Sequence, residues 1–109
     1  MKERDLQTAV FEFLAVTLPP DCGAFCIPKG DGRMTRAPGA LAGIPDICLI
    51  YRGRPIFIEL KSSTGELRRH QLHVHNRLTL AGSVVAICRS VDDVERFLKM
   101  VIPLRGGLT

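Results

Sequence analysis

The spacing of hydrophobic residues along the chain changes between a helical period of about 3.6 residues and a strand period of two. The helical period predicts three helices, over residues 3–18, over residues 66–80, and from Ser90 to about Met100. Pro19 and Pro20 end the first helix, because proline has no amide hydrogen to donate. Gly82 follows the second helix in the position of a C-terminal glycine cap, and Ser90 is a typical N-terminal cap for the third.

Four shorter runs rich in apolar and β-branched residues predict strands over residues 24–27, 44–51, 55–61 and 83–88. Gly53 is at the centre of the short connection between the second and third strands, so these two are expected to form a hairpin. The second helix lies between the hairpin and the last strand, which suits a crossover to a parallel strand. The predicted fold class is therefore α/β, with a mixed central sheet flanked by helices.

A length of 109 residues predicts a single domain over residues 1–109. The composition, 46% hydrophobic and 24% charged, is that of a globular chain rather than a disordered one. The apolar runs are too short to span a bilayer and the first residues lack the pattern of a signal peptide. We therefore expect a cytoplasmic protein with no membrane partner. The net charge of +4 permits nucleic-acid binding but is no evidence for it.

The four cysteines do not indicate metal chemistry. Cys22 and Cys26 have three residues between them, with no second pair to complete a zinc site. Cys48 and Cys88 lie inside apolar strands, where cysteine behaves as a small hydrophobic residue.

The strand over residues 55–61 departs from an apolar pattern at its end. Strand alternation places Phe57, Glu59 and Lys61 on one face. One interpretation is an exposed edge strand that carries a surface ion pair. The preceding strand favours another, because hairpin pairing brings Asp46 roughly opposite residues 59–61. Two carboxylates and a lysine then converge at the open end of the hairpin.

Two neighbouring carboxylates repel each other, and burial adds to the cost of their charge. A divalent cation relieves both penalties. Oxygen ligands with water in the remaining positions suit Mg²⁺ or Mn²⁺ rather than zinc. The sequence therefore predicts Mg²⁺ or Mn²⁺ as the cofactor, with Asp46 and Glu59 as metal ligands.

Polar residues also border the apolar face of the first helix. Leu6, Val10 and Phe13 mark the centre of that face, and Glu3 and Gln7 lie at its border.

In the second helix, Gln71 lies inside the inner stripe that Leu67, Val74, Leu78 and Ala81 define. A buried glutamine needs hydrogen-bond partners. Those partners are either a strand end, which is a structural role, or the carboxylate site, and the sequence leaves both open.

Together these residues resemble the PD-(D/E)XK nuclease superfamily and, more narrowly, its VRR-NUC (virus-type replication-repair nuclease) family. That family's pattern is Glu-x-x-Leu-Gln on a helix, then Gly-x-Pro-Asp, Glu-x-Lys, and a downstream Gln followed by Leu and Gly. The corresponding residues here are Glu3, Leu6, Gln7, Gly43, Pro45, Asp46, Glu59, Lys61, Gln71, Leu78 and Gly82. The full ordered set is far more specific than any one of its parts, and it extends from residue 3 to about residue 90.

The resemblance implies a restriction-endonuclease-like αβββαβ core and Mg²⁺- or Mn²⁺-dependent hydrolysis of phosphodiester bonds in DNA. It also implies a structure-selective endonuclease, for Holliday junctions or other branched DNA, in replication, repair or recombination. Free-standing members of this size resemble phage proteins and resolvase-like homodimers. We therefore expect DNA and a second copy of the chain as partners, no small-molecule organic cofactor, and a bacterial or phage-infected host cytosol.

The expected catalytic residues are Asp46, Glu59, Lys61, Gln71 and Glu3. The metal ligands would be Asp46, Glu59 and the backbone carbonyl of Leu60, with Glu3 binding directly or through water. Lys61 would orient or activate the attacking water, and Gln71 would position Lys61 or that water.

Basic residues in two stretches are expected to contact DNA phosphates. They are Lys29, Arg33 and Arg36 in the glycine-rich loop over residues 28–43, and Arg68 and Arg69 near the start of the second predicted helix. Phosphate contacts supply affinity and salt dependence rather than sequence reading. The alternative for each stretch is a solvated surface.

Four other functions compete with this one. A histidine-asparagine nuclease motif at His73, His75 and Asn76 is disfavoured, since side chains two residues apart on a helix point in different directions. A restriction-type or transposase-like enzyme would need more chain for sequence readout. A non-catalytic or partner-dependent DNA-binding module remains open, as does a purely structural ion-pair cluster, although the intact set of Asp46, Glu59 and Lys61 argues against a degenerate site.

Overall fold

The computed structural model describes residues 2–26 and 43–105. In chain order its elements are α1 (Glu3–Thr17), β1 (Cys22–Cys26), β2 (Ile47–Tyr51), β3 (Arg54–Leu60), α2 (Arg69–Leu80), β4 (Val84–Cys88) and α3 (Val91–Val101). The described strands form one sheet in the order β1-β2-β3-β4. The first three strands are antiparallel neighbours, and β4 is parallel to β3. The predicted α/β class, element order and mixed sheet are therefore confirmed.

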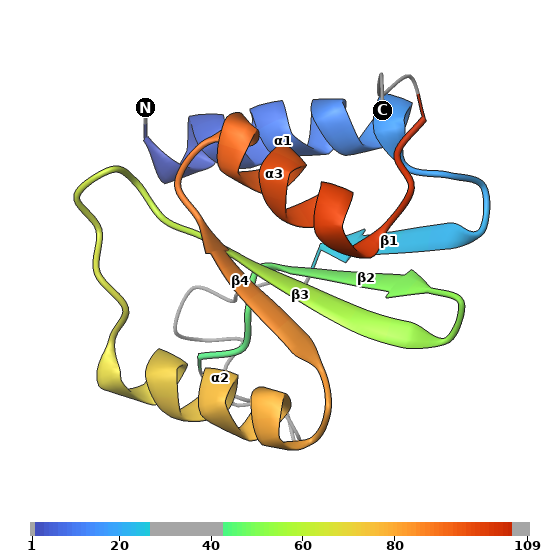
Figure 1. Cartoon of the computed structure of the whole chain (residues 1–109). Coiled ribbons are helices and arrows are strands. Elements are labelled where there is room, and N and C mark those ends of the chain that lie inside the picture. The colour runs from blue at the N-terminus through green and yellow to red at the C-terminus, as the bar shows by residue number, and fades with distance from the viewer. Residues whose placement is uncertain (1, 27–42, 106–109) are drawn as a thin grey trace.

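The helices cover the two faces of the sheet unequally (Figure 1). α1 and α3 lie side by side on one face, and α2 lies on the other. The core is enclosed between the sheet and the helices α1 and α3, and its members are Leu6, Val10, Leu14, Ile47, Leu49, Ile56, Ile58, Leu60, Cys88, Val94, Leu98 and Ile102. No helix in the described ranges is both long and apolar enough to cross a membrane.

The buried stripe of α1 differs slightly from the predicted one. Leu6, Val10 and Leu14 are buried, whereas Phe13 is only half-buried. Steps of four residues keep one face of a helix toward the core, so Leu14 occupies the place that the prediction gave to Phe13.

The turn between β2 and β3 consists of two residues, whereas the predicted strands leave three residues between them. Tyr51 pairs with Arg54, and Arg52 and Gly53 have φ values of 51° and 78°. Two successive residues with positive φ are the signature of the tight turn whose twist matches that of the strands. Arg52, which adopts this uncommon conformation without being glycine, donates through Nε to Asp21 Oδ2 at 3.0 Å.

The second helix begins three residues later than predicted. Arg68 is extended, with φ −80° and ψ 160°, and its N–H donates to Gln71 Oε1 at 2.9 Å. A side chain three residues into the helix thus satisfies an N–H at its start. At the other end, Ser83 N–H donates to the Leu78 carbonyl and Gly82 has a φ of +96°. The predicted glycine cap is confirmed as a Schellman motif.

The remaining boundaries differ by one to three residues. β2 begins at Ile47 rather than at residue 44, because Gly43 has a positive φ and Pro45 has no N–H for a strand ladder. At α3, Ser90 Oγ accepts from Asp93 N–H at 3.1 Å, which confirms the predicted cap.

Candidate active site

Asp46 and Glu59 meet at the open end of the hairpin, as predicted. The last pair in the β2–β3 register is Ile47 with Ile58, so Asp46 stands one step further, opposite Glu59. The Leu60 N–H donates to Asp46 Oδ2 at 2.7 Å. The carboxylate of Asp46 is thereby fixed against the backbone of the residue that follows Glu59.

The turn before Asp46 explains why its motif begins with glycine. Gly43 has a φ of +87°, and a Cβ added there would lie 2.7 Å from the carbonyl oxygen of His70. Both facts exclude a side chain at Gly43. The close approach holds the turn against the first residues of α2, and the buried Pro45 then leads the chain to Asp46.

Glu59 is almost completely enclosed. β3 lies between β2 and β4, and the side chain of Glu59 is 1% exposed. The edge-strand interpretation of this segment is therefore wrong. The neighbouring Ile58 and Leu60 belong to the core under α1 and α3, so strand alternation directs Glu59 to the opposite face, which α2 covers.

A histidine that we did not assign to the site contacts Glu59. His75 Nε2 lies 3.2 Å from Glu59 Oε1, and the His75 side chain is 7% exposed. From the sequence we consider His75 only within a disfavoured histidine-asparagine motif, and we assign the inner stripe to Leu67, Val74, Leu78 and Ala81, with Gln71 inside that stripe. In fact the buried residues of α2 are Gln71 and His75, and Ala81 is exposed. The spacing of four residues from Gln71 to His75 is the signal that would have found it.

Lys61 follows directly after β3 and is 8% exposed. Its N–H donates to the Cys88 carbonyl at 3.1 Å, which extends the pairing of β3 with β4 past the end of β3. Arg89 Nη1 then donates to the carbonyls of Ser62 and Gly65 at 2.7 and 2.6 Å. The segment after Lys61 is thus tied to the end of β4.

Gln71 is buried in the first turn of α2, at 6% exposure. Because its Oε1 accepts from the Arg68 N–H, the group it can offer to the site is its amide nitrogen, a donor. The bond to Arg68 is a structural role, made with a helix end instead of the strand end that we considered.

Glu3 is at the exposed start of α1, where its Oε1 lies 3.5 Å from the position of a Cβ at Gly65. It therefore borders the segment that follows Lys61. Among the described residues, no three His, Cys, Asp or Glu side chains form a group that could hold a metal ion. Glu3 thus does not complete a three-side-chain set with Asp46 and Glu59, and a role through water stays a prediction.

The donor set nonetheless fits the predicted cofactor. Mg²⁺ is typically bound by one or two carboxylates, with water and substrate phosphates in the other positions. Asp46, directly before β2, and Glu59, on β3, supply two carboxylates next to the backbone of Leu60. All of these donors are hard oxygen atoms, which suit Mg²⁺ or Mn²⁺.

Three cysteines, Cys22, Cys48 and Cys88, offer no thiolate to such a site. Loss of contact with water, with the charge of Asp93 as a smaller cause, raises the pKa of Cys88 to about 12. Desolvation also raises the pKa of Cys22 and Cys48, with a smaller contribution from Asp21 at Cys22. These thiols stay neutral at pH 7, in agreement with the interpretation of Cys48 and Cys88 as small hydrophobic residues.

Only two of the five residues predicted to contact DNA lie in the described part of the chain. Arg68 and Arg69 are exposed at the start of α2. Lys29, Arg33 and Arg36 lie outside the described residues.

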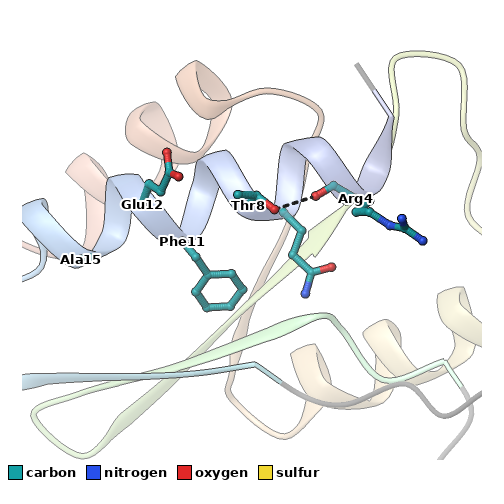
Figure 2. A pocket seen from close by; sticks show the side chains of 6 residues that line it. Arg4, Thr8, Phe11, Glu12 and Ala15 are labelled. Atoms are coloured by element: carbon teal, nitrogen blue, oxygen red, sulfur yellow. Dashed lines mark hydrogen bonds between the residues drawn. The ribbon is translucent and has the colours of Figure 1, made fainter.

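A separate hollow of about 490 Å³ runs along α1 (Figure 2). Its lining residues are Arg4, Gln7, Thr8, Phe11, Glu12 and Ala15. Phe11 extends from the helix toward the strands, whereas Glu12 extends from the other side. The hollow contains neither Asp46 nor Glu59, so it is distinct from the carboxylate site.

Comparison with known proteins gives a structural likeness only. No family model and no curated protein matches the sequence. The fold is similar to that of a solved "VRR_NUC domain protein", with a TM-score of 0.74 and 20% identity over 91% of this chain and 86% of that one. A structure described as "VRR_NUC domain" gives a TM-score of 0.67 and 23% identity over 93% of this chain and 98% of that one. The fold predicted from the resemblance is thereby confirmed.

Proposed function

We propose that this chain is a VRR-NUC nuclease that hydrolyses phosphodiester bonds in DNA with Mg²⁺ or Mn²⁺. The observation that carries the proposal is the carboxylate pair, in which Asp46 accepts from Leu60 N–H beside the buried Glu59. The VRR_NUC fold and the ordered set of motif residues support it. Neither support alone would suffice, because one fold can host many functions.

Asp46 and Glu59 would hold the divalent ion, together with the Leu60 carbonyl. When bound, the ion would lower the pKa of a water molecule and neutralise charge on the scissile phosphate. Asp46 is suited to this task because its bond to Leu60 fixes its carboxylate before any ligand arrives. Glu59 is suited because its nearly complete burial restricts its side chain.

Lys61 would orient the attacking water and stabilise the negative charge that develops on the phosphate oxygens. Its backbone bond to Cys88 holds the stem of the side chain at the end of the sheet. Gln71 would donate its amide hydrogens to the attacking water or to another site acceptor. Glu3 would act through water.

The DNA would be bound mainly through phosphates, by Arg68 and Arg69 and by the basic loop residues Lys29, Arg33 and Arg36. Only six per cent of the residues are aromatic, which disfavours a base-stacking platform. Recognition of DNA shape, such as a branch or a Holliday junction, is consistent with this composition. We propose a homodimer that presents two active sites to one branched molecule.

Cleavage of labelled DNA tests the proposal. The purified protein is incubated with a four-way junction, a flap, a duplex or a single strand, with Mg²⁺, Mn²⁺ or EDTA. We expect metal-dependent cutting, and a loss of about 100-fold or more in Lys61→Met, because Lys61 is assigned a charge-stabilising role. Lys99→Met, which removes an exposed lysine of α3, should cut like the wild type.

Circular dichroism establishes that each variant is folded. Failure of the folded wild-type protein to cut any substrate would contradict the enzyme assignment, and DNA binding without cutting would favour a non-catalytic module. Equal cutting by Lys61→Met and the wild type would remove Lys61 from the mechanism.

A further inference from the structure

The contact between His75 and Glu59 joins two side chains that both lack access to water. Their exposed fractions are 7% and 1%, and His75 Nε2 lies 3.2 Å from Glu59 Oε1. The two residues come from different elements, α2 and β3, on the face of the sheet opposite the core. A contact of this kind has to be explained, because a buried carboxylate is costly unless hydrogen bonds satisfy it.

We infer that His75 is a positioning residue, whose Nε2–H donates to Glu59 and holds that carboxylate in the orientation needed to bind the metal ion. The inference rests on the proposed function, since it assigns Glu59 as a ligand. A ring N–H occupies one lone-pair direction of a carboxylate oxygen and thereby limits rotation of the group. Ligating carboxylates are generally supported by such hydrogen bonds from outer residues.

The structure of α2 makes His75 suitable for this role. Gln71 and His75 are one helical turn apart and are the two buried residues of the helix. The bond from Arg68 N–H to Gln71 Oε1 fixes where the helix begins. The close approach of Gly43 to the His70 carbonyl fixes the helix against the turn before Asp46. One helix therefore contacts both the turn that leads to Asp46 and the side chain of Glu59.

A purely structural role of His75 and a positioning role predict different effects of substitution on metal binding. If His75 only filled space beneath the sheet, an apolar residue of similar size would leave metal binding unchanged. If it orients Glu59, then removal of the donor weakens metal binding even when the fold is intact. The decisive measurement is therefore metal affinity, with activity as a second readout.

The experiment compares three substitutions at position 75. His75→Gln keeps a donor near the position of Nε2, His75→Asn withdraws the donor toward the backbone, and His75→Leu removes it. His73→Leu is the matched control, because His73 is exposed on the same helix. Mn²⁺ affinity is measured by calorimetric titration, and folding by circular dichroism and thermal melting.

We expect His75→Leu and His75→Asn to weaken Mn²⁺ binding by about 10- to 100-fold, the usual effect of losing such a support. His75→Gln should stay within a few-fold of the wild type, and His73→Leu should be unchanged. Cleavage by the two weakened variants should recover as Mn²⁺ is raised, which a general loss of folding would not permit. If His75→Leu does not fold, the pair of His75→Gln and His75→Asn decides the question.

The outcomes separate this inference from the proposed function. If the wild-type protein binds no Mn²⁺ and cuts no DNA, the proposed function is wrong and the inference falls with it. If the wild type binds and cuts, and folded His75→Leu or His75→Asn has the same Mn²⁺ affinity, only the positioning role is overturned.

Discussion

Glu59 has the lowest exposure of the buried polar and charged side chains in the described ranges. Burial of a charge costs several kcal/mol unless partners compensate for it. A valine or isoleucine at this position would suit a central strand better, as its neighbours Ile58 and Leu60 indicate. The residue therefore departs from what stability alone would select, as functional residues often do.

Gly43 provides a test of how the turn before Asp46 is held. Gly43→Ala should destabilise the protein, because alanine is strained at a φ of +87° and its Cβ would meet the His70 carbonyl at 2.7 Å. The strained backbone costs about 1–2 kcal/mol. The clash should add about 1–3 kcal/mol. Urea unfolding followed by circular dichroism measures the total.

Gly82→Ala is the matched control for this substitution. Gly82 has a φ of +96°, but nothing lies within 4 Å of an added Cβ. Gly82→Ala should therefore lower the free energy of unfolding only by the cost of the strained backbone. Equal destabilisation by the two substitutions would contradict the close packing of Gly43 against α2.

At the scale of elements, hairpin pairing correctly predicted that Asp46 lies opposite Glu59. Alternation placed Glu59 and Lys61 on one face, and hairpin pairing placed Asp46 opposite Glu59, because both follow from local geometry. The same reasoning left open whether β3 is an edge strand. Whether a strand is interior depends on which segments pair with it, and β4 comes from more than twenty residues further along the chain.

The face of α2 was harder to predict, because its apolar residues suggested the wrong stripe. Val74 and Leu78 are only half-buried, whereas the polar Gln71 and His75 face the sheet. Hydrophobicity identifies the inner face of a helix only when that face packs against an apolar core. Here the helix packs beside a carboxylate, so hydrogen bonding determines which residues lie inside.

The outer side of α2 leads to a prediction about DNA binding. The helix contains no acidic residue, and Arg69 is exposed in its first turn. Arg69→Ala should weaken DNA binding and reduce the slope of log K against log salt by about 0.9, which is the loss of one phosphate contact. Fluorescence anisotropy with duplex and junction DNA, in EDTA and at several salt concentrations, measures both quantities.

Arg96→Ala is the control, because Arg96 is an exposed arginine on α3, on the other face of the sheet. It should leave the affinity and the slope unchanged. Identical salt slopes for Arg69→Ala and the wild type would mean that Arg69 belongs to a solvated surface.

At the scale of the whole molecule, β3 connects the site with the core. Ile56, Ile58 and Leu60 pack under α1 and α3, while Glu59 projects from the same strand toward α2. Unfolding of the core must therefore also separate Glu59 from Asp46 and from His75. A ligand that requires both carboxylates binds only the folded chain, and its binding free energy adds to the stability of the entire fold.

This coupling predicts that Mn²⁺ raises the melting temperature of the protein. At a concentration of 100 times Kd the gain is about 2.7 kcal/mol. For a chain of this size, that corresponds to a rise of about 10 °C. In Glu59→Gln, Mn²⁺ should no longer raise the melting temperature, because a neutral amide is a weaker ligand than a carboxylate. The control is Glu12→Gln, on the exposed side of α1, in which Mn²⁺ should raise the melting temperature as in the wild type. Differential scanning calorimetry in EDTA and in Mn²⁺ provides the comparison, and an equal rise in both variants would place the ion somewhere other than at Glu59.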